Sequence, residues 1–338
     1  SSAEAYLKPV RDRNNLTVIT HAKASRVLFE NGKAIGVVYM QNEKGAHEIL
    51  ASREVILSGG AINSPQLLML SGIGPAAHLK AHGIDVLVDA PGVGGNLQDH
   101  LDVCTLQRCT QNVTYDKTND IAIGLNFYLF KQGAGTSNIA EAGGFTRSPL
   151  AEDERPDIQF HFVPAQLDDH GRNRLPGLGY TLHACFLRPK SRGRISLNSA
   201  NPNDKVKIES CYLSDTEGFD IKVMREALRL SRKILSQEAF AAYRGEELLP
   251  GPEVQENDAI DDFIRRKGES IYHPIGTCKM GREDDAEAVV DSQCRVIGVK
   301  GLRVVDASIM PKLIGGNTNG PTMMIAERAA DLILGKSH

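Results

Sequence analysis

Short runs of β-branched and apolar residues alternate with turn residues in the first part of the chain. Residues 16–20 (LTVIT) and 35–40 (IGVVYM) are two such runs, and Asn31-Gly32 lies between them. β-Branched residues favour strands and an Asn-Gly pair favours a tight turn, so the pattern predicts two strands here. Residues 54–60 (EVILSGG) predict a further, buried strand that ends in two glycines. Such a glycine turn lets the backbone approach a ligand closely.

Helical spacing of apolar residues follows in three places. The segment 61–75 (AINSPQLLMLSGIGP) has Asn63 and Ser64 as candidate caps and an early Pro65. The segment 321–335 (PTMMIAERAADLILG) opens with a proline and ends at a glycine, as a capped helix does. A third helix is predicted between 215 and 240, where one stripe holds Ile221, Met224, Ala227, Leu228, Leu230 and Ile234.

The middle of the chain has a different pattern. Apolar residues alternate or run continuously at 157–164, 179–187 and 193–197, which predicts strands of a mixed or antiparallel sheet. Near the C-terminus, 302–308 (LRVVDAS) predicts one more buried strand. The pattern as a whole predicts a fold that mixes helices and sheets.

Charge and composition exclude several classes of function. The 39 basic and 42 acidic residues leave a net charge of −3, which provides no electrostatic footprint for nucleic acid. No run approaches the roughly 18 consecutive apolar residues that predict a membrane-spanning helix. The six cysteines show no C-x-x-C pair and no zinc-type spacing with histidine, so we expect free thiols, a reducing compartment and no metal site. The first residues, SSAEAYLKPV, have no signal-peptide character and resemble a chain entered in the middle of a larger protein.

Two polar segments near the C-terminus contain candidate chemistry. In 271–281 (IYHPIGTCKMG), Pro274 favours an extended backbone at His273, which suits a general base. Because the chain has ten histidines, a structural loop histidine is the alternative. In 315–322 (GGNTNGPT), the amide of Asn317 can hold a substrate oxygen without titrating, or it can simply belong to a helix entrance.

A third segment, 91–103 (PGVGGNLQDHLDV), is a glycine-rich turn that can cradle a phosphate or a ring, or can be an ordinary loop. Its Asp99 and His100 suggest acid–base chemistry, although an aspartate that caps or orients a neighbour is the simpler interpretation. No complete Ser/His/Asp set is present, and Ser64 lacks the flanking glycines of a nucleophile elbow. Hydrolase chemistry is therefore not supported.

These segments, taken in order, resemble the glucose–methanol–choline (GMC) oxidoreductase family. The likeness extends from residue 2 to residue 335, and SNIAEAGGF and YRGEELLPG are similar to segments of bacterial choline dehydrogenases and their aliphatic-alcohol relatives. The four segments that carry it are 60–75 (GAINSPQLLMLSGIGP), 91–101 (PGVGGNLQDHL), 273–281 (HPIGTCKMG) and 301–333 (GLRVVDASIMP to GGNTNGPTMMIAERAADLI).

The resemblance implies an α/β (α+β) fold in two parts. An incomplete FAD-binding domain around a parallel sheet is expected from 1–103 and from 265–338, and the second stretch holds the catalytic residues. A substrate-binding domain is expected at 104–264, with an antiparallel sheet and helices.

The resemblance also implies FAD-dependent oxidation of a primary alcohol, choline or an aliphatic alcohol, to the aldehyde by hydride transfer to flavin. His273 matches the catalytic histidine of the family. Asn317 matches the second member of the catalytic pair, which is histidine or asparagine in the family. The positions that line the flavin in the family correspond to Asn96, Asp306, Ala307, Asn319 and Thr322.

The chain also departs from the family pattern. No G-x-G-x-x-G turn follows a strand and the family's first signature is missing, so we expect this chain alone to bind FAD poorly. A cofactor-free remnant acting as a binding or structural module is one alternative, and an oxygen-using alcohol oxidase is another. The chain has no tryptophan and 5% aromatic residues, which disfavours an aromatic cage for choline and favours a neutral alcohol.

The expected partners are a small-molecule alcohol and an electron acceptor, which the sequence leaves open between a quinone, an artificial dye and O2. No nucleic-acid partner is expected. The expected location is cytoplasmic, and peripheral association with the inner membrane and homo-oligomerisation are both left open.

Overall fold

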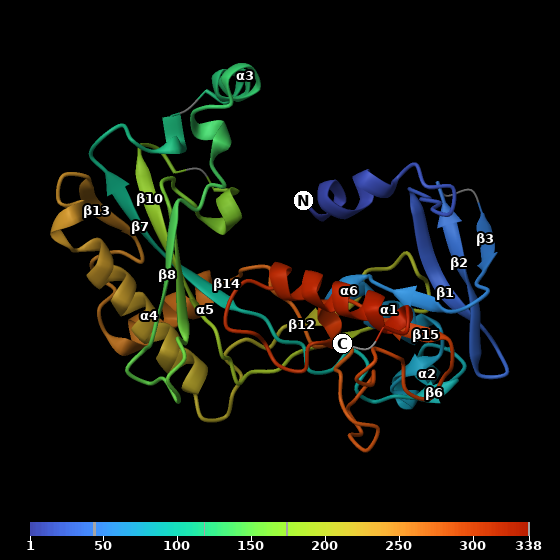
Figure 1. Cartoon of the computed structure of the whole chain (residues 1–338). Helices are drawn as coiled ribbons and strands as arrows, with labels where there is room; N and C mark the ends of the chain where they lie inside the picture. The colour runs from blue at the N-terminus through green and yellow to red at the C-terminus, as the bar shows by residue number, and fades with distance from the viewer. Residues whose placement is uncertain (43–44, 118, 174, 337–338) are drawn as a thin grey trace.

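The computed structural model describes residues 1–42, 45–117, 119–173 and 175–336. The elements form two groups that lie side by side, and each group has its own hydrophobic core (Figure 1). One core joins residues from both ends of the chain. The other core is built from the middle of the chain, between Leu101 and Ile264.

The first group begins with an antiparallel sheet of three strands. These are β1 (Ala22–Glu30), β2 (Lys33–Gln41) and β3 (Ala46–Leu50). Asn31 and Gly32 join β1 to β2 with positive φ angles, as a tight hairpin turn requires. The strand predicted at 35–40 is therefore confirmed. The strand predicted at 16–20 is wrong, because the hairpin pairs only from Ala22, opposite Gln41, and the residues before it have no partner strand in the described sheet.

Two short parallel strand pairs complete the sheets of the first group. β4 (Val55–Leu57) pairs with β15 (Leu302–Val304), and β5 (Ile73–Gly74) pairs with β6 (Val88–Asp89). The strands predicted at 54–60 and 302–308 are thus confirmed, although the second ends early in a 3₁₀ turn at Ala307–Ile309. The two ends of the chain are joined through the β4–β15 pair.

Three helices pack beside these strands, α1 (Gly60–Leu70), α2 (Ala76–Ala81) and α6 (Asn319–Ile333) (Figure 1). Both predicted helices of this group are confirmed. The predicted caps of α1 are wrong, because Asn63 and Ser64 lie inside the helix. The helix starts earlier because the carboxylate of Asp306 accepts a hydrogen bond from the Gly60 N–H at 2.9 Å and satisfies the helix start.

The second group is a six-stranded antiparallel sheet. Its main path runs β13-β7-β10-β9-β8, and β14 pairs with β7. The strands are β7 (Leu101–Cys109), β8 (Ala142–Thr146), β9 (Ile158–Val163), β10 (Gly179–Phe186), β13 (Arg244–Leu249) and β14 (Glu269–Ser270). The strands predicted at 157–164 and 179–187 are confirmed, and so is 193–197, which forms β11 (Arg194–Ser196) and pairs with β12 (Lys207–Glu209).

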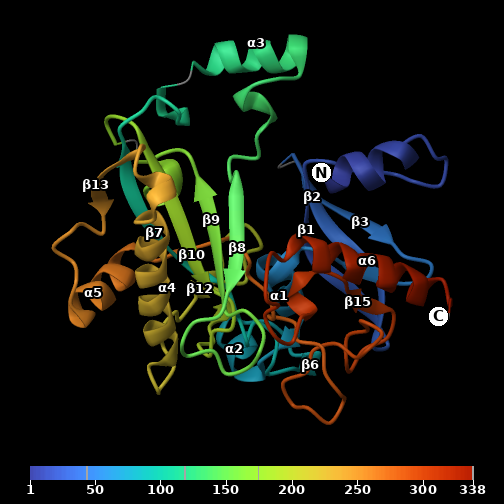
Figure 2. The same ribbon diagram turned by 60° about the vertical axis from the view of Figure 1, so that its left-hand side comes forward.

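Two helices, α4 (Phe219–Leu235) and α5 (Asn257–Lys267), pack against one face of this sheet (Figure 2). The predicted stripe of α4 is confirmed in its centre, where Met224, Ala227 and Leu228 are fully buried, but Ile234 at its end is 36% exposed. The sequence analysis did not predict α5 or α3 (Asp120–Phe130), which projects from the body of the molecule (Figure 1).

The architecture confirms a mixed fold with parallel and antiparallel sheets. Among the described residues, no helix combines the length and the apolar character that crossing a membrane requires.

Candidate active site

The face of the large sheet opposite α4 is polar. Alternate side chains of a strand point to opposite faces, so Ile158 and Phe160 face the helices while Gln159 and His161 face away. Strand register aligns Cys104, His183 and His161 in one row across β7, β10 and β9, and Asp102, Cys185 and Gln159 in the next row. The Nε2 atom of His161 and the Oε1 atom of Gln159 are buried without a hydrogen-bond partner among the described residues. This face therefore offers unsatisfied polar atoms to a ligand.

The loop that carries His273 lies at the edge of this polar face and is held on both sides. On one side, Gln98 pairs with Ile275 through two backbone hydrogen bonds. On the other side, the N–H groups of Cys278 and Met280 donate to the carbonyls of Ser308 and Ile309. The loop thus joins the segment after β6 to the segment after β15.

Gly276 is required for this packing. Its φ angle is +93°, and a Cβ atom there would lie 2.5 Å from the carbonyl oxygen of Asn96 and 2.9 Å from its amide nitrogen. A side chain at this position would push the two loops apart.

A buried aspartate orients the backbone on both sides of the site. The Oδ1 atom of Asp99 accepts hydrogen bonds from the backbone N–H groups of His100 and His273, both at 2.9 Å. Its Oδ2 atom accepts hydrogen bonds from the hydroxyls of Tyr212 and Ser270. Asp99 therefore orients its neighbours. The sequence had favoured this interpretation over a role of Asp99 in acid–base chemistry.

His100 and His273 form a hydrogen-bonded pair. Their Nδ1 atoms lie 2.9 Å apart, and the rings meet edge to face with centroids 5.1 Å apart. The Nε2 atom of His100 lies 3.2 Å from the carbonyl oxygen of Leu187, which can only accept. His100 therefore carries its proton on Nε2 and accepts at Nδ1, so His273 must donate from Nδ1. This assignment leaves the Nε2 atom of His273 with a free lone pair.

Burial keeps both imidazoles neutral. His100 is fully buried, and burial together with His273 lowers the pKa of His100 to about 3. His273 is 7% exposed, and burial lowers its pKa as well, although Asp99 acts in the opposite direction. A neutral imidazole with a free lone pair has the protonation state of a general base near neutral pH.

The predicted partner Asn317 lies beside the polar face of the sheet. Its Oδ1 atom accepts a hydrogen bond from the Nε2 atom of Gln159 at 2.8 Å. The backbone of Ile314, three residues earlier, interacts with His100. The loop that ends in Asn317 therefore passes close to the histidine pair, and the amide nitrogen of Asn317 remains as a donor.

Two of the predicted cofactor residues hold the protein itself together. The amide nitrogen of Asn96 donates to the carbonyls of Gly276 and Pro311 at 3.2 and 3.3 Å, and its Oδ1 accepts from Gln98. Asp306 is buried and accepts hydrogen bonds from the Gly60 N–H, the Ser64 hydroxyl and the Ser308 N–H. Their contact with a flavin remains a prediction.

The other three predicted residues lie close by. The carbonyl of Ala307 accepts a hydrogen bond from the Gly276 N–H at 3.3 Å, so Ala307 is next to the His273 loop. Asn319 is the exposed first residue of α6, and the Thr322 hydroxyl donates to the carbonyl of Thr318 within the first turn. All five predicted cofactor residues thus lie in the segments that meet around this loop and the start of α6.

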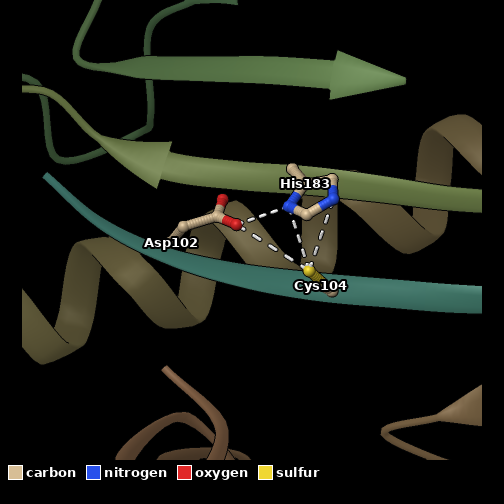
Figure 3. A group of neighbouring side chains, drawn as sticks. All are labelled: Asp102, Cys104 and His183. Atoms are coloured by element: carbon tan, nitrogen blue, oxygen red, sulfur yellow. Dashed lines mark hydrogen bonds and ion pairs between the residues drawn. The ribbon is translucent and has the colours of Figure 1, made fainter. Parts of the chain in front are cut away.

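A second group of polar side chains, which no sequence pattern predicted, lies on the same sheet face. Asp102, Cys104 and His183 come together across β7 and β10 (Figure 3). Burial opposes a charge on His183, but Cys104 and Asp102 outweigh it and raise the pKa of His183 well above its ordinary value. Cys104 and His183 are 79 positions apart, so only the pairing of the two strands could have revealed the group.

Comparison with known proteins adds to this geometry. Two family models, both described as GMC oxidoreductase, match residues 1–102 and 189–326. The chain is 51% identical to an alcohol dehydrogenase [acceptor] of Pseudomonas putida, covering 99% of this chain and 61% of that protein. It is also 51% identical to the mitochondrial choline dehydrogenase of Mus musculus, covering 99% of this chain and 56% of that protein.

Solved structures give the same picture. A pyridoxine 4-oxidase from Mesorbium loti superposes with a TM-score of 0.86 at 31% identity, over 100% of this chain and 62% of that one. A formate oxidase variant from Aspergillus oryzae superposes with a TM-score of 0.90 at 26% identity, over 96% of this chain and 62% of that one. The chain therefore spans between 56% and 62% of the length of these four proteins.

Proposed function

Because this chain belongs to the GMC oxidoreductase family, we propose that it serves the FAD-dependent oxidation of a primary alcohol to an aldehyde, with His273 as the general base. The observation that supports this proposal most strongly is the hydrogen-bonded chain Leu187–His100–His273, which leaves a free lone pair on His273. The alternative of a cofactor-free structural remnant is not favoured, because the relatives that match almost the whole chain are named as dehydrogenases.

His273 acts on the hydroxyl of the alcohol. The O–H proton passes to the Nε2 atom of His273, the carbonyl double bond forms between oxygen and carbon, and the hydride leaves the carbon for the acceptor that bound FAD would supply. Loss of the proton raises the electron density that expels the hydride. General-base assistance of this kind typically contributes about 10²–10⁴-fold to the rate. The Nδ1 hydrogen bond to His100 keeps the ring oriented while the charge on His273 changes.

Asn317 would hold the alcohol oxygen. Its Oδ1 atom is engaged by Gln159, which leaves the amide N–H groups to donate to an oxygen that becomes negative as the proton leaves. One such preorganised donor is typically worth about 3–4 kcal/mol of the barrier. The unsatisfied Gln159 Oε1 and His161 Nε2 atoms offer further contacts to the substrate.

The residues present fit part of a flavin nucleotide, since no G-x-G-x-x-G turn for the pyrophosphate follows a strand in this chain. A Cβ atom at Gly320, the second residue of α6, would meet nothing within 4 Å, so the start of this helix leaves room for a close ligand. Backbone N–H groups at a helix start suit phosphates and electron-rich ring edges. Bound FAD would supply the hydride acceptor. The residues that would hold FAD are Asn96, Asp306, Ala307, Asn319 and Thr322. The FAD-binding domain would consist of 1–103 and 265–338, and the substrate-binding domain of 104–264.

We favour a neutral, aliphatic primary alcohol over choline. The buried carboxylate on the polar sheet face, Asp102, is paired with His183 at 2.5 Å, and the raised pKa of His183 favours its charged form. The pair therefore gives this sheet face little net charge. An ammonium group would need an unpaired carboxylate or an aromatic cage.

The acceptor and location complete the proposal. The electron acceptor is a quinone, an artificial dye or O2, since the relatives include both an alcohol dehydrogenase [acceptor] and an oxygen-dependent choline dehydrogenase of Brucella ovis. We also propose a cytoplasmic protein that binds peripherally at the inner membrane, since Ile121, Tyr128 and Phe130 of the projecting helix α3 are 65–76% exposed and apolar. Association between copies is the other use of such a surface.

The deciding experiment measures flavin reduction by alcohols in the FAD-loaded protein. His273→Ala should lower the rate by about 10²–10⁴-fold while the flavin content is unchanged. Aliphatic alcohols should reduce the flavin faster than choline does. An unchanged rate in His273→Ala would remove the histidine from the reaction, and faster reduction by choline would reverse the choice of substrate. Oxygen consumption compared with dye reduction identifies the acceptor.

A further inference from the structure

Asp102, Cys104 and His183 place three different metal-ligating atoms within reach of one another. The Sγ atom of Cys104 lies 3.1 Å from Nδ1 of His183 and 3.7 Å from Oδ2 of Asp102, and the last two atoms are 2.5 Å apart (Figure 3). Asp102 and Cys104 are alternate residues of β7, and His183 is directly opposite Cys104 on β10. Because two paired strands fix all three Cβ positions, the group is preorganised.

The distances can be compared with those around a tetrahedral ion. Zinc bonds of about 2.0–2.3 Å at tetrahedral angles separate neighbouring ligand atoms by roughly 3.3–3.6 Å. The sulfur–oxygen distance already agrees, the sulfur–nitrogen distance is slightly short, and only the nitrogen–oxygen pair must open.

A second observation also indicates a ligand. Asp102 is 5% exposed, and its Oδ1 atom is buried without a hydrogen-bond partner among the described residues. An unpaired oxygen on a buried carboxylate is costly, and a cation that Oδ1 also contacts removes that cost. The three side chains also line a cavity of about 180 Å³, which has room for a water molecule as a fourth ligand.

The charges of the cluster suit a divalent ion. A thiolate and a carboxylate together neutralise two positive charges, and a neutral imidazole adds none, so the occupied site has no net charge to desolvate. Binding would release the thiol proton of Cys104 and the proton shared by His183 and Asp102. The other cation of the cavity wall, Lys267, is paired with Asp168 at 2.8 Å and does not oppose the ion directly.

We propose that Asp102, Cys104 and His183 form a site for Zn²⁺ or a similar borderline-soft divalent cation, with one coordination position open to the cavity. Mixed sulfur, nitrogen and oxygen ligands select such ions over Mg²⁺ and Ca²⁺, which prefer oxygen ligands alone. This site lies on the same sheet face as the proposed reaction at His273, and its cavity is also lined by Ile271 and Tyr272 of the neighbouring loop. The metal titration below needs no flavin, so it can fail or succeed independently of the proposed reaction.

The test is a titration of the tag-free 338-residue chain with Co²⁺, followed by competition with Zn²⁺. One Co²⁺ per chain should give the near-ultraviolet absorption of a cobalt–thiolate bond and visible bands of tetrahedral intensity, and Zn²⁺ should displace both. Cys104→Ser should remove the thiolate absorption and weaken Zn²⁺ binding by at least about tenfold, the loss that even an outer-shell partner can cause. Cys211→Ser, at an exposed cysteine outside the cluster, is the matched control and should bind as the unchanged chain does.

His183→Gln gives an independent check, because it keeps the thiol and removes only the imidazole. It should also weaken Zn²⁺ binding by at least about tenfold. The proposal is overturned if the unchanged chain gives no thiolate absorption, if Cys104→Ser keeps it, or if His183→Gln binds with full affinity. Absorption lost in Cys211→Ser and retained in Cys104→Ser would assign the metal to an adventitious surface thiol and would equally overturn it.

Discussion

Replacement of His100 tests whether the histidine pair fixes the proton on His273. His100→Leu removes the Nδ1 acceptor, so the Nδ1 proton of His273 loses its partner 2.9 Å away. A hydrogen bond of this kind is worth about 0.5–1.5 kcal/mol net, which corresponds to a change of about two- to thirteenfold in the ratio of the two neutral tautomers. Proton transfer to Nε2 needs the Nδ1–H tautomer, so the rate of flavin reduction should fall, by at most this factor.

His100→Asn is the matched variant. The Oδ1 atom of asparagine lies close to the position of the imidazole Nδ1 and is an acceptor, so the His273 tautomer should be retained. Both variants leave the carbonyl of Leu187 without its donor, and both should therefore be destabilised by about 1–3 kcal/mol. If the two variants are equally stable but differ in the tautomer of His273, the difference is due to the hydrogen-bond acceptor at residue 100.

The assay is ¹⁵N spectroscopy of the chain with labelled histidine. A ring nitrogen that carries a proton and one that does not have well separated chemical shifts, so the spectrum reports the tautomer without any cofactor. The chain has ten histidines, and the signals of His273 are assigned by their loss in His273→Gln. The reasoning is refuted if Nδ1 of His273 is unprotonated in the unchanged chain, or if His100→Leu leaves the tautomer as it was.

Three more predictions follow from the geometry. Because burial lowers the pKa of His273 from its ordinary value of about 6.5, the histidine should become protonated, and flavin reduction should slow, only below that pH. A midpoint above 6.5 in the pH profile of flavin reduction would contradict this. Asp306→Ala should reduce the free energy of unfolding in urea by at least about 2 kcal/mol, because two buried donors and one part-buried donor lose their acceptor. Asp284→Ala, at an exposed ion pair, should change it by less than about 0.5 kcal/mol. Leu228→Ala in the core should reduce the free energy of unfolding by about 2–5 kcal/mol, and Ile234→Ala, at the exposed end of the same helix, should reduce it by less. Equal reductions in the two variants would contradict the packing of α4 described above.

The sequence predicted most of the regular elements because their signals are local. The Asn31-Gly32 turn and the α4 stripe need only neighbouring residues to be recognised, and both are present. The strand expected at 16–20 had suitable composition, but a strand also needs a partner strand. The pairing of β1 with β2 begins only at Ala22, so residues 16–20 have no strand beside them. Partner choice depends on residues far along the chain, which a local pattern does not contain.

The site was predictable only in part for the same reason. The resemblance indicated His273 and Asn317, and the motif around Asp99 indicated a residue that orients its neighbours. The tautomer of His273 depends on His100, which is 173 positions away, and on the carbonyl of Leu187. The Asp102, Cys104 and His183 cluster depends on strand register, so no spacing rule for metal ligands would detect it.

The pairing of β4 with β15, which lie far apart in the sequence, affects how the protein folds during its synthesis. Asp306 and Gly60 are 246 positions apart, and the β4–β15 pair spans a similar interval. Synthesis of 246 residues at about 5–20 residues per second takes roughly 12–50 s, during which β4 on a ribosome has no β15 to pair with. The sheet of the second group is complete by Ser270, so it can form while the first core waits. Nascent chains should therefore gain protease resistance in two stages, the middle segment first, and the early strands are the part that needs chaperone protection.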